Sequence, residues 1–125
     1  MFGDVLQYTG AALIFVWGAA HIAALKPVVA GFGPLSTENR RIIALEWTAE
    51  GLTLCFLGVL ALLVTLLGSP TDAVTAVVLR AVAVMLFAMA GLSAATGARS
   101  SIVPMRLCPF VKTAVGVLLV VGSAV

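Results

Sequence analysis

The sequence predicts an all-α integral membrane protein, folded as a single antiparallel bundle of four transmembrane helices in up-down-up-down order. Of its 125 residues, 62% are hydrophobic and only 10% are charged, whereas soluble domains are about half apolar and a quarter charged. The mean hydropathy is +1.22, and a chain this short could not hide so much apolar surface from water. The apolar residues also form four stretches that are long enough to cross a bilayer.

The four predicted spans cover about residues 5–26, 42–67, 71–95 and 102–125. The first ends or kinks at Lys26-Pro27, because proline lacks the amide that a helix interior uses. The next segment, VVAGFGPLSTEN, has the Gly, Pro, Ser and Asn of a loop, and its early apolar part is expected near the membrane interface. Loops this short place consecutive helices antiparallel to one another.

The second connection, GSPTD, predicts a tight turn at residues 68–72. Ser69 is the expected N-cap of the third helix, with Pro70 at its first helical position and Asp72 completing a capping-box pattern. Pro109 falls inside the fourth span and is expected to bend it.

Basic residues predict the orientation of the bundle. Five of the seven Lys and Arg residues lie in or beside the first and third connections: Lys26, Arg40, Arg41, Arg99 and Arg106. The positive-inside rule therefore places these two connections in the cytoplasm and both termini outside. The net charge of +2 is explained by topology and by contact with anionic membrane lipid, so no nucleic-acid partner is expected.

Ionisable side chains also lie within the predicted spans, namely His21, Glu46, Glu50, Arg80 and Lys112. At about 1.5 Å per residue, their depths in the membrane overlap. A charge at mid-bilayer costs at least about 2.5 to 3.5 kcal/mol, and such residues face the bundle interior and pair with one another. We therefore predict one polar cluster, biased to the cytoplasmic half, in which two acids balance two bases.

Glu46 and Glu50 are one turn apart and share a helix face. Together with His21 they are the predicted catalytic residues, acting as proton donors and acceptors. A purely structural ion-pair network is the alternative, since buried pairs can fix helix register.

Five further residues are predicted to contact a substrate: Trp17, Trp47, Arg80, Arg106 and Lys112. Trp17 lies one turn before His21 and is placed to stack on it. Trp47 fits either a pocket or an interfacial aromatic belt. Lys112 or Arg80 would stabilise developing negative charge.

No metal site is predicted, and no cofactor is identified. The Glu-x-x-His pattern of di-metal bundles is absent, and His21 is the single histidine of the chain. Haem ligation by His21 would require an oligomer that supplies more than one copy. Cys55 and Cys108 lie in apolar stretches with no CxxC spacing, and we expect both as small buried hydrophobic residues.

Small residues are dense in the first and third spans, as in AMAGLSAATGA, and such faces let helices approach closely. We expect them to pack within the bundle or between copies, and we predict a homo-oligomer.

The stretch NRRIIALEWTAEGLTLCFLGVLALLVTLLG, preceded by GFGPLSTEN, resembles a pattern in small bacterial four-helix integral membrane proteins of no known activity. The resemblance covers mainly the first connection and the second span, and it rests chiefly on Glu46-Trp47 and Glu50-Gly51. It implies a bacterial inner membrane and carries over no functional residues.

Two functions are consistent with these features. In the first, a polar intramembrane pocket binds or converts a lipophilic small molecule by proton transfer. In the second, the same charges form a proton or ion path, or the chain is an accessory subunit of a larger membrane complex. Whether the protein is an enzyme stays open.

Overall fold

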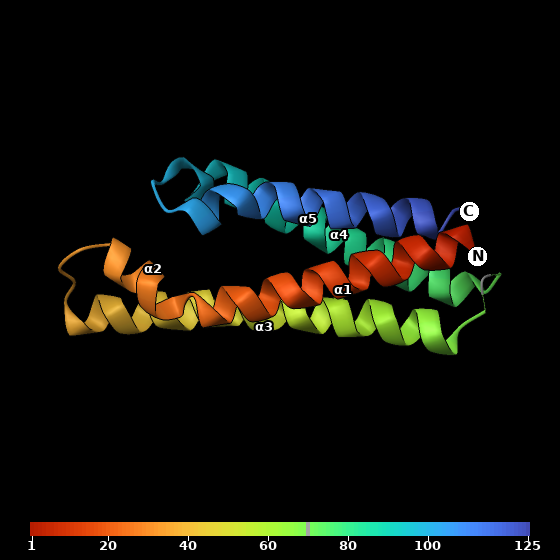
Figure 1. Cartoon of the computed structure of the whole chain (residues 1–125), viewed down its shortest axis with the longest axis horizontal. Helices are drawn as coiled ribbons and strands as arrows, with labels where there is room; N and C mark the ends of the chain where they lie inside the picture. Colours follow the sequence, from red (N-terminus) through yellow and green to blue (C-terminus); the bar gives the residue numbers. More distant parts are fainter. Residues whose placement is uncertain (70) are drawn as a thin grey trace.

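The computed structural model describes residues 1–69 and 71–125, and within them every regular element is helical (Figure 1). The elements are α1 (Phe2–Ala23), α2 (Leu25–Gly31), α3 (Thr37–Leu67), α4 (Ala73–Ala95), the 3-10 turn η1 (Gly97–Arg99) and α5 (Val103–Gly122). The four long helices, α1, α3, α4 and α5, are each long and apolar enough to cross a membrane. The all-α four-helix bundle predicted from the sequence is confirmed.

The four long helices run antiparallel to their neighbours in the chain, and they pack as two pairs that meet through α1 and α5. α1 packs along α3, α4 packs along α5, and α1 also packs along α5. α3 and α4 contact each other far less. In Figure 1 the α1–α3 and α4–α5 pairs converge near the two termini and diverge toward the opposite end.

An apolar core lies between the converging halves of the helices. Its buried members come from all four long helices: Ala11, Ile14, Leu54, Leu57, Ala61, Leu79, Val82, Ala83, Leu86, Val115 and Leu119. Large apolar side chains such as Phe56 and Phe110 are more than 60% exposed on the outer surface. An apolar exterior around an apolar core is what a lipid-facing bundle requires.

The first connection differs from its prediction. Residues 25–31, expected as a span end and a loop, form the short helix α2, which turns away from the axis of α1 (Figure 1). Pro27 lies in the first turn of α2, where its missing amide leaves no helical hydrogen bond unmade. The loop proper is confined to the few residues around Gly33, whose φ of +76° is left-handed.

The second span begins earlier than predicted, at Thr37 instead of residue 42. The hydroxyl of Ser36 accepts a hydrogen bond from the Asn39 amide at 3.1 Å, which caps the helix. α3 therefore has 31 residues and is about 46 Å long, whereas the bilayer core is about 30 Å thick. α3 is therefore longer than one crossing needs, and its first two turns carry Arg40 and Arg41.

The N-cap of α4 is Asp72 and not Ser69, so this part of the prediction is wrong. The Asp72 carboxylate accepts hydrogen bonds from the amides of Val74 and Thr75, both at 3.2 Å, and α4 begins at Ala73. A carboxylate satisfies two orphan amides at once and also interacts with the helix dipole. The predicted role of Pro70 lies outside the described residues, whereas Pro109 lies inside α5 as predicted.

The cap predicts a pH dependence. The Val74 amide, followed by the Thr75 hydroxyl and amide, lowers the pKa of Asp72 below its usual value of 3.8. Because the pKa is depressed in the folded state, the stabilisation is complete above the ordinary Asp pKa and disappears as the pH falls through the depressed value. We expect Asp72→Ala to lower the thermal midpoint at pH 6 and to flatten its dependence on pH below about 4. An unchanged pH profile in thermal scans of the variant would contradict the capping role.

Candidate functional site

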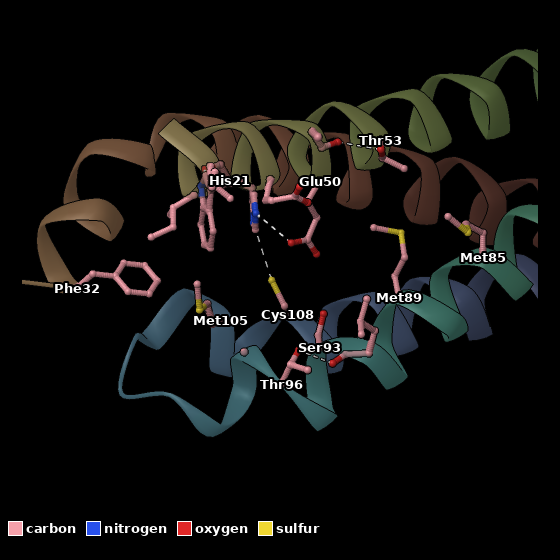
Figure 2. Close-up of a pocket in the computed structure, with 17 residues that line it drawn as sticks. His21, Phe32, Glu50, Thr53, Met85, Met89, Ser93, Thr96, Met105 and Cys108 are labelled. Atoms are coloured by element: carbon pink, nitrogen blue, oxygen red, sulfur yellow. Dashed lines mark hydrogen bonds and ion pairs between the residues drawn. The ribbon is translucent and has the colours of Figure 1, made fainter. Parts of the chain in front are cut away.

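A cavity of about 620 Å³ opens between α3 and α4 near the diverging end of the bundle (Figure 2). α3 and α4 supply most of its wall, His21 of α1 and Cys108 of α5 lie at its inner side, and Phe32 lies at the end of α2. The cavity lies between two helices that make few contacts with each other. Most of its lining is apolar, so the few polar groups stand out.

The polar groups centre on Glu50, which projects from α3 toward the cavity (Figure 2). Lys112 of α5 donates hydrogen bonds to Glu50 Oε1 and, at 2.7 Å, to the hydroxyl of Ser93 on α4. Glu50 Oε2 lies 3.4 Å from His21 Nε2. All four long helices thus contribute one member to this cluster.

The two charged partners differ sharply in exposure. The Lys112 side chain is 0% exposed, whereas the Glu50 side chain is 30% exposed. A fully buried ammonium is tolerated only when it is paired and hydrogen-bonded, and Lys112 meets both conditions. Glu50 is therefore the face of the ion pair that a molecule in the cavity can reach.

His21 is held tightly by α3. The ring of Trp47 stacks on the imidazole, with 3.7 Å between ring centroids and an interplanar angle of 11°. Trp47 Nε1 also donates a hydrogen bond to the His21 carbonyl oxygen. The imidazole is 4% exposed and has one orientation available to it: Nε2 faces Glu50, and Nδ1 faces Cys108 Sγ at 3.9 Å.

The structure brings together His21, Glu50, Lys112 and Trp47 from the predicted site, and it places Glu46 on the cavity wall. Glu46 is exposed, and within the described residues it makes no ion pair. The expected balance of two acids and two bases therefore reduces to one pair, Glu50 with Lys112.

Arg80 lies outside the cluster in which it was predicted, and Arg106, predicted as a substrate contact, does not line this cavity. Arg80 is exposed and donates a hydrogen bond to the Ser123 hydroxyl at 3.2 Å, about 20 Å along α4 from Ser93. Arg106 faces a separate hollow between α4 and α5. An exposed Arg can extend its guanidinium toward headgroups and water, so neither needs an interior partner.

Trp17 does not occupy its predicted position either. It packs against the apolar core, and its Nε1 has no hydrogen-bond partner among the described residues. The i, i+4 spacing does align Trp17 with His21, but Trp47 from the neighbouring helix already covers the imidazole. Stacking between helices has replaced the stacking expected within one helix.

Sequence reasoning missed Ser93 and the site role of Cys108. Cys108 lies four residues before Lys112, so the two share one face of α5, and this spacing was available in the sequence. Ser93 gives no such signal, because its partner Lys112 is on another helix. No group of three His, Cys, Asp or Glu residues in the described ranges is arranged to hold a metal ion.

The arrangement supports proton exchange at Glu50. Its carboxylate faces the cavity, His21 Nε2 lies beside one oxygen, and Lys112 neutralises the other.

No protein-family model matches this chain, and no curated protein or solved structure matches it either.

Proposed function

We propose that the protein binds a lipophilic small molecule in the cavity between α3 and α4, and that Glu50 exchanges a proton or hydrogen bond with its polar group. The observation that carries this proposal is the asymmetry of the ion pair. Lys112 is fully enclosed, whereas Glu50 is 30% exposed toward an otherwise apolar cavity. A merely structural pair has no need to present one partner to a cavity.

The size and chemistry of the cavity define the ligand class. Its volume of about 620 Å³ lies within the range of about 300 to 1,000 Å³ of small-molecule sites. The Trp47 ring and the thioethers of Met85 and Met89 offer polarisable apolar contact. Glu50 presents its carboxylate to this space, so the site favours an apolar body that carries an amine or hydroxyl donor, whereas Glu46 on the same wall is exposed.

A proton or ion path across the bundle has less support. Between the Glu50 cluster and Gln7, which lies about 21 Å along α1 from His21, the core side chains are apolar. Ile14, Leu54 and Leu86 are all 0% exposed. A charge would have to cross this layer without a polar partner, at the cost of several kcal/mol. Docking to a larger complex would leave the cavity unexplained.

The setting follows from the charges. We propose that the cavity end of the bundle lies at the cytoplasmic face and both termini outside, because the basic residues cluster on the connections at that end. The resemblance of residues 31–68 to small bacterial membrane proteins is the basis for proposing a bacterial inner membrane. The seam between α3 and α4 would admit ligands directly from lipid. We also propose that the apolar outer faces associate with other copies of the chain.

The test compares ligand binding by two charge variants in nanodiscs. The probe is 1-aminoanthracene, a lipophilic amine whose fluorescence rises in apolar surroundings. We expect saturable binding to the wild type above empty nanodiscs. The neutral double variant Glu50→Gln/Lys112→Met should bind at least tenfold more weakly, because a hydrogen bond to a charged group contributes about 1.5 to 3 kcal/mol.

Two controls make this result specific. Glu46→Gln removes the neighbouring, unpaired carboxylate and should weaken binding no more than threefold. Anthracene, which lacks the amine, should bind the wild type and the double variant alike. Equal affinity of the amine for the wild type and the double variant would refute the role of Glu50.

A further inference from the structure

Four sulfur-containing side chains line the cavity, with Met105 and Cys108 on one side of Glu50 and Met85 and Met89 on the other (Figure 2). Three of the four methionines of the chain, Met85, Met89 and Met105, line it together with Cys108, one of the two cysteines. Met105 and Cys108 lie one turn apart on α5, and Met85 and Met89 lie one turn apart on α4. Two helices thus present their thioethers and a thiol to the same space (Figure 2).

The imidazole of His21 adds a nitrogen donor beside this sulfur group. Although the ring is 4% exposed, Nε2 has no hydrogen bond within the described residues, and the partner of Nδ1 is the weakly bonding thiol of Cys108 at 3.9 Å. Buried imidazole nitrogens normally have good partners. Nε2 has the Glu50 carboxylate 3.4 Å away, so the weakly partnered atoms are Nδ1 and the sulfur of Cys108, a residue that is 3% exposed.

We propose that His21 Nδ1 and Cys108 Sγ, with the thioether of Met105, bind one Cu(I) ion. In protein metal sites the metal lies about 2.0 Å from an imidazole nitrogen and about 2.3 Å from a thiolate sulfur. Because Nδ1 and Sγ are 3.9 Å apart here, the N–metal–S angle would be about 130°. This angle is wider than tetrahedral and leaves room for a third ligand. The Met105 sulfur accepts a hydrogen bond from the Ser100 hydroxyl at 3.5 Å, and the three rotatable bonds of the side chain would let it exchange this weak contact for the metal.

The ligand chemistry and the charge both select a soft monovalent ion. Thiolate and thioether ligands favour Cu(I), whereas structural Zn²⁺ takes four ligands, and no third His, Cys, Asp or Glu in the described ranges completes such a set. Cu(I) and one thiolate sum to zero charge, which an apolar interior accepts, while Zn²⁺ would leave a net positive charge. The Cys108 thiol releases its proton to water as the metal binds.

Glu50 would orient the His21 ring from the side opposite the metal. Metal-bound histidines usually donate their other ring N–H to a carboxylate, and Glu50 Oε2 lies 3.4 Å from His21 Nε2. Lys112 keeps this carboxylate neutralised. The copper site uses Nδ1 and sulfur, whereas the proposed ligand contact uses the Glu50 carboxylate, so the copper proposal does not rest on that function.

The experiment titrates purified protein with Cu(I) under ascorbate, in competition with the chromophoric chelator bicinchoninate. We expect one Cu(I) per chain. Cys108→Ser should lower the affinity at least 100-fold, and Met105→Leu, which conserves volume, should lower it about tenfold. Cys55→Ser is the matched control and should bind like the wild type, because Cys55 hydrogen-bonds the Phe15 carbonyl oxygen at 3.6 Å and does not line the cavity.

Copper K-edge absorption of the wild type provides a second measurement that does not depend on variants folding. We expect mixed sulfur and imidazole ligands. Coordination by sulfur alone or by nitrogen and oxygen alone, retention of copper by Cys108→Ser, or loss of copper from Cys55→Ser would each overturn the site.

Discussion

Replacing Lys112 with methionine should lower the free energy of unfolding by about 3 to 5 kcal/mol, the usual effect of leaving one member of a buried ion pair without its partner. Lys112 is 0% exposed and bonds both Glu50 and Ser93. The substitution keeps the length and apolar stem of the side chain, so the loss reflects the uncompensated Glu50 carboxylate and the Ser93 hydroxyl. Equilibrium unfolding by SDS in mixed micelles, followed by circular dichroism, measures it.

The double variant Glu50→Gln/Lys112→Met separates charge pairing from packing. Because both charges are gone, it should recover most of the stability lost in Lys112→Met. Glu46→Gln, at an exposed position without an ion pair, should stay within about 0.5 kcal/mol of the wild type. If the double variant is as unstable as Lys112→Met, the two residues are not energetically coupled and the cluster is not organised by the ion pair.

Gly18→Ala should destabilise the bundle by about 1 to 3 kcal/mol through overpacking. A Cβ at Gly18 would lie 2.8 Å from the Gly51 carbonyl oxygen and 2.8 Å from the Cys55 amide nitrogen. Both are backbone atoms of α3, so relief requires α1 and α3 to separate. This clash outweighs the gain of about 1 kcal/mol in helix propensity that alanine brings.

The same separation should disturb the site, since His21 follows Gly18 by one turn of α1 and its ring stacks on Trp47 of α3. We expect altered tryptophan fluorescence together with the loss of stability. Gly91→Ala is the matched control, because a Cβ there meets nothing within 4 Å, and it should leave stability unchanged or raise it by about 0.5 to 1 kcal/mol. If both variants behave alike, close approach of α1 and α3 does not limit the packing.

Much of the cluster was predictable from depth alone. The rise per residue places His21, Glu50 and Lys112 at similar heights, and the cost of a charge in hydrocarbon requires the charged side chains to pair. Depth cannot give the direction in which a side chain points around its helix. Glu46 and Glu50 share a face by spacing, yet Glu50 alone of the two reaches Lys112, and Arg80 turns to the surface.

Local interactions explain the remaining differences at the helix ends. Ser36 caps α3 by accepting one backbone hydrogen bond and Asp72 caps α4 by accepting two, and several polar residues in each connection could have done so. The residue that caps each helix depends on how the helix ends are placed relative to one another, and the hydropathy pattern of the sequence does not contain that information.

The sequence by itself determined the four spans, the all-α class and the need for paired charges inside the bundle, because the hydrophobic effect and the absence of water in lipid act on composition and spacing. The tertiary structure decided which charges pair, that Trp47 and not Trp17 covers His21, and that Cys108 faces the imidazole. These depend on the rotation of each helix about its axis, which close contacts such as that of Gly18 with α3 fix only when all the helices pack together.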